Sequence, residues 1–461
     1  MSYNTADVDV HQERYNSAGS FVRVRGCCAK NFQVFATYKH QKPKFPYLSS
    51  RLYLTFTTEQ PKTRSRNKCR GIMADISSQN SAQKSFSLNS YQTALAVIPP
   101  RHLWNRIDRL RSVYDAAYLK WPPHINVIYP FVRPESLDEA VVQISKALSC
   151  YVPLRVGDED DSDDDTPPSL WFHLNKVGVF RHKGRGNNTI YLCDDNQKHI
   201  DGLSHLRREI LSVLGKNDDR YTPHMTIAQS EGDVRSAQHK FLFEKVGLVP
   251  AVEWRAPELC VLVRERLEGG DGNTTRMRLW GTIGLDGTVQ KEQVPQEFYD
   301  ESEEPSKNSA AKNELLTSLP YFFNDDFNVW LSFRTDLASP DGPSEVSRSR
   351  LTVSSYNVMA EFEWPPSESR YPLLVKNILH PEAEADVLVL QEVTDAFLSY
   401  LLASQDLRDA YPYCSHGPPR QDDVDPLPSH LNIVVLSKVP FSWEYVSLSS
   451  KHKSALVATF R

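Results

Sequence analysis

The chain has 461 residues, 40% of them hydrophobic, and its 53 Lys and Arg against 58 Asp and Glu give a net charge of -5. This length exceeds the ~250 residues at which a single hydrophobic core stops growing, so we expect more than one domain. No apolar run approaches the ~18 residues that a membrane span needs. The start of the chain lacks a secretion-signal pattern, and the seven cysteines show no Cys-x-x-Cys spacing. We therefore expect a cytoplasmic or nuclear protein with neither structural zinc nor a disulfide framework.

The first 87 residues are basic. Residues 1–72 carry 13 Lys and Arg against 4 Asp and Glu. A basic arm can hold nucleic acid by releasing counterions, but a solvated segment has the same composition. Of the two interpretations we favour a basic, disordered leader over 1–87.

Residues 88–285 alternate strand and helix patterns in two similar halves, which predicts a bilobal α/β (α+β) domain. In chain order we expect a strand at 93–98, a helix at 102–114, a strand at 125–132, a helix at 137–148, a short strand at 153–156, a hairpin at 171–193, a helix at 200–214, a strand at 224–228, a helix at 234–246, and strands at 258–263 and 277–285. Between the halves lies an acidic tract at 158–165. Contiguous like charges repel and stay solvated, so we expect a surface loop there without chemistry.

One short pattern occurs once in each half. Pro123-His124-Ile125-Asn126 and Pro223-His224-Met225-Thr226 each give a proline, a histidine, an apolar residue and a hydrogen-bonding residue, 100 positions apart. Because side chains alternate along a strand, each histidine shares a face with the polar residue two positions later. Two such strands side by side line a groove with two imidazoles and two hydrogen-bond donors.

This set of groups suits the opening of a phosphodiester without a metal or other cofactor. Such a reaction needs a base for the attacking water and an acid for the departing ribose oxygen, and histidine can serve as either near neutral pH. Asn126 and Thr226 can donate hydrogen bonds to phosphoryl oxygens. The sequence leaves open which histidine is the acid.

The pattern of histidine followed by a polar residue is weak by itself. It also occurs at His173, His430 and His452. His124 and His224 differ because each follows a proline, begins an apolar strand and holds the same place in its half.

On these residues, 91–285 resembles the 2H phosphoesterase superfamily of RNA 2′,3′-cyclic phosphodiesterases and 2′-5′ RNA ligase-like proteins. The resemblance implies a bilobal fold, acid and base roles for His124 and His224, and phosphate contact by Thr226. Asn126 departs from the family pattern, which has Ser or Thr there, and this puts the rate and the substrate range in doubt more than the reaction class.

Residues 286–348 are rich in Glu, Ser, Pro and Lys, which predicts a polar linker. After it, 349–461 begins a second α/β domain, with strands at 351–358 and 385–393 around a helix at 371–380. Asn357 and Glu392 stand where these two strands end. Their oxygen ligands suit Mg²⁺, although a glutamate after a strand is more often a solvated loop residue.

The second domain resembles the start of the endonuclease/exonuclease/phosphatase family, a Mg²⁺-dependent phosphodiesterase fold; 431–437 and 454–460 resemble its next two core strands. The resemblance implies that Asn357 and Glu392 help to hold the metal. The later Gly-Asp-x-Asn and Ser-Asp-His signatures do not occur before Arg461, so we expect an incomplete, inactive domain in a fragment of a larger RNA-processing protein.

Three hypotheses follow. The first is a metal-independent phosphodiesterase acting on RNA ends, either a 2′,3′-cyclic phosphate or a related nucleotide phosphodiester. The second places the main activity in a longer parent chain, as a Mg²⁺-dependent nuclease or a nucleotidyltransferase of the poly(A) polymerase type. The third is a catalytically silent module that binds RNA ends. The expected partners are RNA or nucleotides, not a membrane, and the oligomeric state stays open.

Overall fold

The structure is a computed structural model. It describes residues 9–15, 19–27, 32–37, 85–150, 168–182, 187–218, 220–266, 275–299, 318, 320–332, 350–359, 367–447, 452 and 454–460. The predicted acidic loop at 158–165 and the short strand at 153–156 lie outside these residues. None of the helices in the described part of the chain combines the length and apolar character that a bilayer crossing needs.

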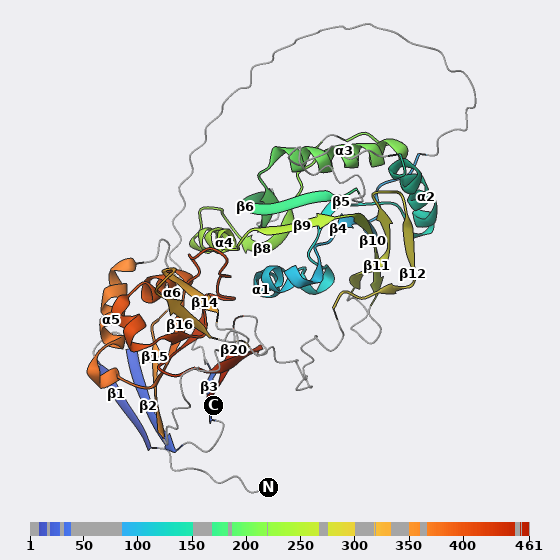
Figure 1. Ribbon diagram of the computed structural model, residues 1–461. Helices are drawn as coiled ribbons and strands as arrows, with labels where there is room; N and C mark the ends of the chain where they lie inside the picture. Colours follow the sequence, from blue (N-terminus) through green and yellow to red (C-terminus); the bar gives the residue numbers. More distant parts are fainter. Residues whose placement is uncertain are drawn as a thin grey trace, which may run out of the picture. The chain divides into compact units, whose positions relative to one another are not determined.

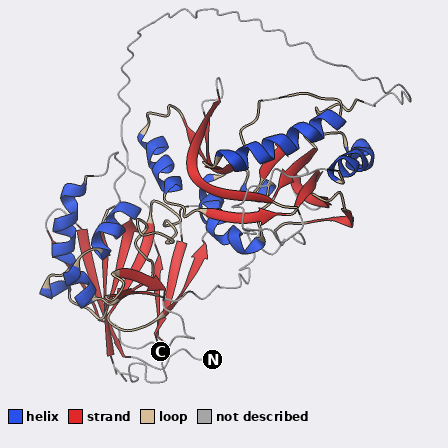
Figure 2. Cartoon of the chain, turned by 45° about the horizontal axis from the view of Figure 1, so that its top comes forward, coloured by secondary structure: helices blue, strands red, loops and turns tan. Residues whose placement is uncertain are grey.

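Residues 85–299 build a nine-stranded sheet in the order β12-β11-β10-β4-β5-β8-β7-β6-β9 (Figures 1 and 2). All its strand pairs are antiparallel. The strands are β4 (Thr93–Val97), β5 (Ile125–Ile128), β6 (Leu170–His182), β7 (Asn187–Asp194), β8 (Met225–Glu231), β9 (Val252–Ala256), β10 (Glu258–Arg266), β11 (Thr275–Gly284) and β12 (Val289–Gln296).

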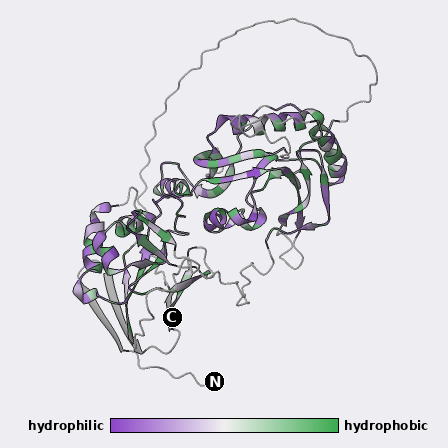
Figure 3. Ribbon diagram, viewed as in Figure 1, coloured by the Kyte–Doolittle hydropathy of each residue, from purple (hydrophilic) through white to green (hydrophobic). Residues whose placement is uncertain are grey.

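The four helices predicted in this part are present. They are α1 (Trp104–Tyr114), α2 (Leu137–Leu148), α3 (Gln197–Val213) and α4 (Ala237–Gly247). Two of them have side-chain N-caps, because Asn196 accepts from the Lys198 amide and Ser236 from the His239 amide. Each helix buries an apolar stripe and keeps a polar face, as the mixed colours of α2 and α3 in Figure 3 show.

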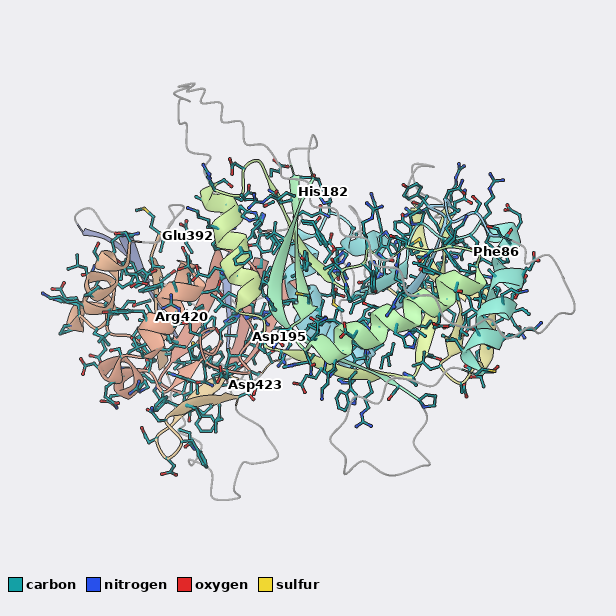
Figure 4. The ribbon with its side chains drawn as sticks, turned by 90° about the horizontal axis from the view of Figure 1, so that it is seen from above. Phe86, His182, Asp195, Glu392, Arg420 and Asp423 are labelled. Atoms are coloured by element: carbon teal, nitrogen blue, oxygen red, sulfur yellow. The ribbon has the colours of Figure 1, made fainter. Side chains whose placement is uncertain are left out.

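The domain core begins slightly earlier than predicted. Phe86, labelled in Figure 4, is 5% exposed and packs in the main hydrophobic cluster, and its amide donates to the Leu214 carbonyl at 3.1 Å. A single phenylalanine before a polar stretch has no periodicity, so its burial could not be read from the pattern.

The two halves of the sheet meet at β5 and β8 through one pair of residues, Ile125 and Met225. Each of these strands then bulges at the same place. In β5 the register against β4 skips Val127, and in β8 the register against β7 skips Ile227. The two halves therefore share a local irregularity one residue after Asn126 and Thr226.

The C-terminal part contains an eight-stranded sheet, β1-β2-β15-β16-β18-β17-β13-β14, and a three-stranded sheet, β19-β20-β3. Strands β15 (Arg350–Asn357) and β16 (Val387–Val393) are parallel, and β18 (Asn432–Ser437) and β20 (Ser454–Phe460) occupy the predicted positions. The other elements are α5 (Tyr371–Ile378), α6 (Asp395–Leu402), α7 (Gln405–Ala410), β17 (Tyr413–Cys414) and β19 (Ser442–Ser447).

Two segments differ from their predictions. The expected disordered leader contains β1 (Asp9–Tyr15), β2 (Gly19–Cys27) and β3 (Phe32–Thr37), which pair with one another or with β15 and β20. The expected linker over 286–348 contains β12 and a hairpin of β13 (Tyr321–Asn324) and β14 (Val329–Ser332). β12 is mostly exposed and held by its ladder with β11, so it lacks the hydrophobic signal that identifies a strand.

Candidate active site

The predicted alternation of side chains is present in both strands. Ile125, Val127, Met225 and Ile227 are at most 1% exposed, whereas His124, Asn126, His224 and Thr226 are all partly exposed. Both histidines and both polar residues therefore stand on the face opposite the core.

The register between β5 and β8 brings the two motifs together. Because Ile125 lies opposite Met225 in an antiparallel pair, the same register places His124 beside Thr226 and Asn126 beside His224. Each imidazole thus neighbours the hydrogen-bonding residue of the other half. The structure unites all four residues that the sequence predicted for this site.

His124 is held in one orientation by three contacts. Its Nδ1 donates to the Pro122 carbonyl at 2.8 Å, which leaves Nε2 unprotonated, and the Asn126 Nδ2 donates to that Nε2 at 3.0 Å. The Trp121 ring stacks on the imidazole with centroids 4.5 Å apart. The Asn126 Oδ1 is buried and has no hydrogen-bond partner among the described residues. An unpaired buried acceptor within a site is a natural partner for a donor on a ligand or water.

His224 is oriented by the same kind of hydrogen bond. Its Nδ1 donates to the Thr222 carbonyl at 2.8 Å, as His124 donates to the carbonyl two residues before it. The rings of Phe180 and Tyr191 lie beside it, with centroids 4.7 and 5.1 Å away. In both halves a backbone carbonyl accepts from Nδ1 and so fixes the tautomer in which Nε2 is unprotonated.

Burial lowers the pKa of His124 to about 3, and the positive charge of Arg111 acts in the same direction, against the Pro122 hydrogen bond. Burial also lowers the pKa of His224. Both imidazoles are therefore neutral at neutral pH in the free protein. One of them can accept a proton at once, and the other must first be protonated.

The lowered pKa of His124 predicts acid destabilisation. Between its ordinary value of 6.5 and about 3, the unfolded chain binds more protons at this position than the folded one. The stabilising contribution is complete above about pH 6.5 and falls as the pH drops. We expect the free energy of unfolding, measured with urea at pH 7 and pH 5, to fall less in His124→Gln than in the wild type. Asp108, whose pKa burial raises to about 6, contributes with the opposite sign in both proteins. An identical fall in both proteins would contradict the assignment.

A layer of buried side chains behind the motifs was not predicted. Arg111 on α1 is 1% exposed, and its guanidinium donates to Asp108, to Asp115 and to the carbonyl of Trp121. Gln229 of β8 donates to the same Asp115 at 3.4 Å. The network thus connects β8 to the residue that stacks on His124.

The other half has a related arrangement. Arg207 on α3 donates to the Val127 carbonyl and lies over the ring of Tyr221, whose hydroxyl donates to the Asn126 carbonyl at 2.8 Å. Trp121 and Tyr221 each stand three residues before a motif histidine. That repeated aromatic position is the sequence signal that could have revealed both.

Gly178 on β6 provides room for Tyr191. A Cβ at this position would overlap the Tyr191 ring, so Gly178→Ala must displace a side chain that contacts His224. We expect a loss of about 1–3 kcal/mol in the free energy of unfolding and a raised KM for any substrate beside His224. Gly202→Ala on α3 is the control, because a Cβ there meets nothing within 4 Å. Equal effects of the two substitutions on KM would argue against a role for Tyr191.

The second predicted site is also brought together. Asn357 ends β15, and its Nδ2 donates to the Glu392 Oε1 of β16 at 2.9 Å, while its Oδ1 accepts from the Met359 amide. Glu392, labelled in Figure 4, is 8% exposed and has a φ of 59°, a region that non-glycine residues rarely adopt. Among the residues that the structure describes, no three His, Cys, Asp or Glu form a group that could hold a metal ion.

Comparison with known proteins identifies the first of these regions. A family model described as the 2′-5′ RNA ligase superfamily matches residues 99–268. A protein of Bacillus cytotoxicus named "Putative phosphoesterase" is 26% identical over 144 residues, which cover 31% of this chain and 72% of that protein. A protein of the same description from Geobacillus kaustophilus is 28% identical over 156 residues, or 33% of this chain and 76% of that protein.

Among solved structures, E. coli LigT complexed with 3′-AMP aligns at 12% identity and a TM-score of 0.28, over 43% of this chain and 99% of that one. Residues 99–268 are a domain of the 2′-5′ RNA ligase superfamily, as the sequence predicted. The endonuclease-like interpretation of the C-terminal part stays a prediction.

Proposed function

We propose that the 2′-5′ RNA ligase superfamily domain at residues 99–268 is a phosphodiesterase that opens 2′,3′-cyclic phosphates, or related nucleotide phosphodiesters, at RNA ends. His124 and His224 form its acid/base pair, and no metal takes part. The observation that carries the proposal is the pairing of the two strands, which puts two neutral imidazoles and two hydrogen-bond donors on one face.

The mechanism needs one neutral and one protonated imidazole. The neutral one takes a proton from the attacking water, and the protonated one gives a proton to the departing ribose oxygen. A negatively charged phosphate between the rings raises the pKa of the imidazole that it touches and so favours the protonated form there. Thr226 and Asn126 stabilise the charge that develops on the phosphoryl oxygens. The Asn126 Nδ2 carries two hydrogens and can donate one of them to a phosphoryl oxygen. Its contact with the His124 Nε2 must break when that nitrogen exchanges a proton with the substrate or water.

The test is hydrolysis by the full chain in excess EDTA, with a short RNA ending in a 2′,3′-cyclic phosphate. We expect conversion to a terminal phosphomonoester, separated by ion-exchange chromatography. A rate that appears only when Mg²⁺ is added would overturn the metal-free mechanism. Saturable binding of the RNA with no product would instead favour the silent binding module.

A second candidate function rests on Asn357 and Glu392. Their contact at the ends of two parallel strands, and the strained backbone of Glu392, favour a functional role. A Mg²⁺ ion would take an oxygen from each, with water and a substrate phosphate supplying the remaining ligands. The bound ion would polarise a phosphoryl oxygen. The test is calorimetric Mg²⁺ binding by the full chain. Loss of the signal in Glu392→Gln supports this function, and an unchanged signal excludes it.

A further inference from the structure

An open cavity of about 480 Å³ lies at the start of the first half of the domain. Its lining comes from the turn before β4 and from the residues after β5: Asn89, Ser90, Tyr91, Gln92, Arg133, Pro134 and Glu135. This volume lies within the range of small-ligand sites. Tyr91 is 65% exposed, which is unusual for so large a ring and leaves an aromatic surface open to a ligand.

The backbone that carries Tyr91 is held firmly. Ser90 exchanges two backbone hydrogen bonds with Phe131, each of 3.0 Å, and the Gln92 amide donates to the Ser90 hydroxyl. The Arg264 Nε donates to the Tyr91 carbonyl at 3.1 Å, and the Arg264 amide donates to the Gln92 carbonyl. A ring on a fixed backbone loses little conformational entropy when a ligand stacks on it.

A series of aromatic contacts connects this ring to the catalytic pair. Tyr91 meets Tyr129 edge to face at 5.6 Å, Tyr129 meets Trp121 at 5.1 Å, and Trp121 stacks on His124. Arg264 reinforces the series by donating to the Tyr129 hydroxyl at 3.2 Å. Tyr91 is therefore separated from His124 by two intervening rings, those of Tyr129 and Trp121. A strand of several nucleotides covers that span.

The polar groups of the cavity suit a base better than a phosphate. Arg133 brings one positive charge and Glu135 one negative charge, so the charged side chains cancel. The amides of Asn89 and Gln92 and the Ser90 hydroxyl offer both donors and acceptors, which is what the edge of a nucleobase requires. An anion subsite would need a net positive charge.

We propose that this cavity binds a base of an RNA strand, stacked on Tyr91, several nucleotides on the 5′ side of the scissile phosphate held by His124 and His224. The preferred substrate is then an oligonucleotide and not a mononucleotide. The inference rests on the proposed function for the location of the reacting phosphate, and it adds the substrate class.

The experiment compares two substrates of the full chain: adenosine 2′,3′-cyclic phosphate and a four-nucleotide oligoadenylate ending in the same group. We expect Tyr91→Ala to raise KM for the tetranucleotide about tenfold with kcat unchanged, since removing one stacking platform has an effect of this size. KM for the mononucleotide should not change. Tyr91→Phe keeps the ring and should behave as the wild type does. Phe243→Ala is the matched control, because it removes another exposed aromatic, on α4.

Equal effects of Tyr91→Ala on the two substrates, or no effect on either, would overturn the proposal. Binding of a fluorescent tetranucleotide with a terminal 3′-phosphate, followed by anisotropy, separates it from the proposed function. If no variant hydrolyses anything, a tenfold rise in Kd confined to Tyr91→Ala still supports the cavity as a base site. An unchanged Kd rejects it.

Discussion

Replacing either His124 or His224 by alanine is expected to lower kcat for cyclic-phosphate hydrolysis by about 10²–10⁴-fold, the usual contribution of a positioned acid or base. KM should change little, because proton transfer stabilises the transition state and not the bound ground state. Neither residue belongs to the core, since both stand on the partly exposed face of their strands. We therefore expect each variant to fold, with an unchanged circular dichroism spectrum.

The double variant makes this prediction sharper. Residues that act as one unit give non-additive losses, so removing both histidines should cost little more than removing one. His173→Ala is the matched control, because His173 also precedes a polar residue by two positions but pairs with Glu253 on neighbouring β9. If either single variant retained the wild-type rate, the two-histidine mechanism would be rejected.

Replacing Arg111 by methionine is expected to have the largest effect on stability. The substitution leaves Asp115, which is 1% exposed, and the largely buried Asp108 without their shared cation. Breaking a buried ion pair by removing one partner costs about 3–5 kcal/mol, because the remaining charge stays desolvated. We expect this loss in the free energy of unfolding measured with urea. A shift of the catalytic pH profile should accompany it, since Arg111 lowers the pKa of His124.

Arg208→Met serves as the control for this substitution. Arg208 is exposed on α3, and its guanidinium donates a long hydrogen bond, of 3.4 Å, to the Ser204 carbonyl. A surface change of this kind alters stability by about 0.5 kcal/mol or less. If the two arginine variants proved equally stable, the network would have no structural role.

Elements that bury a periodic apolar face were predictable. The helix at 137–148 and the strand at 454–460 have the predicted bounds, because the apolar pattern begins and ends with the element. By contrast, β12 and the three strands of the leader were not predictable. Hydrogen bonds to neighbours hold β12, whose side chains are mostly exposed, and no local pattern reports which neighbour will be adjacent.

The site also contains residues that the sequence pattern predicts and residues that it does not. Alternation along a strand was enough to place His124 with Asn126 and His224 with Thr226 on the exposed face. The residues that orient them were missed, since Arg111 acts on Trp121 from a separate helix. Contacts of that kind depend on tertiary packing, which residue spacing does not encode.

The matched bulges of β5 and β8 place a limit on how these strands can vary. Each bulge adds one residue after the polar position, at Val127 and at Ile227. A deletion there would restore a regular ladder and turn every later side chain of the strand to the opposite face. The number of residues in these two strands is therefore as strict a requirement as the identity of the site residues that they carry. Length variation in relatives that keep the reaction should be confined to the connecting loops.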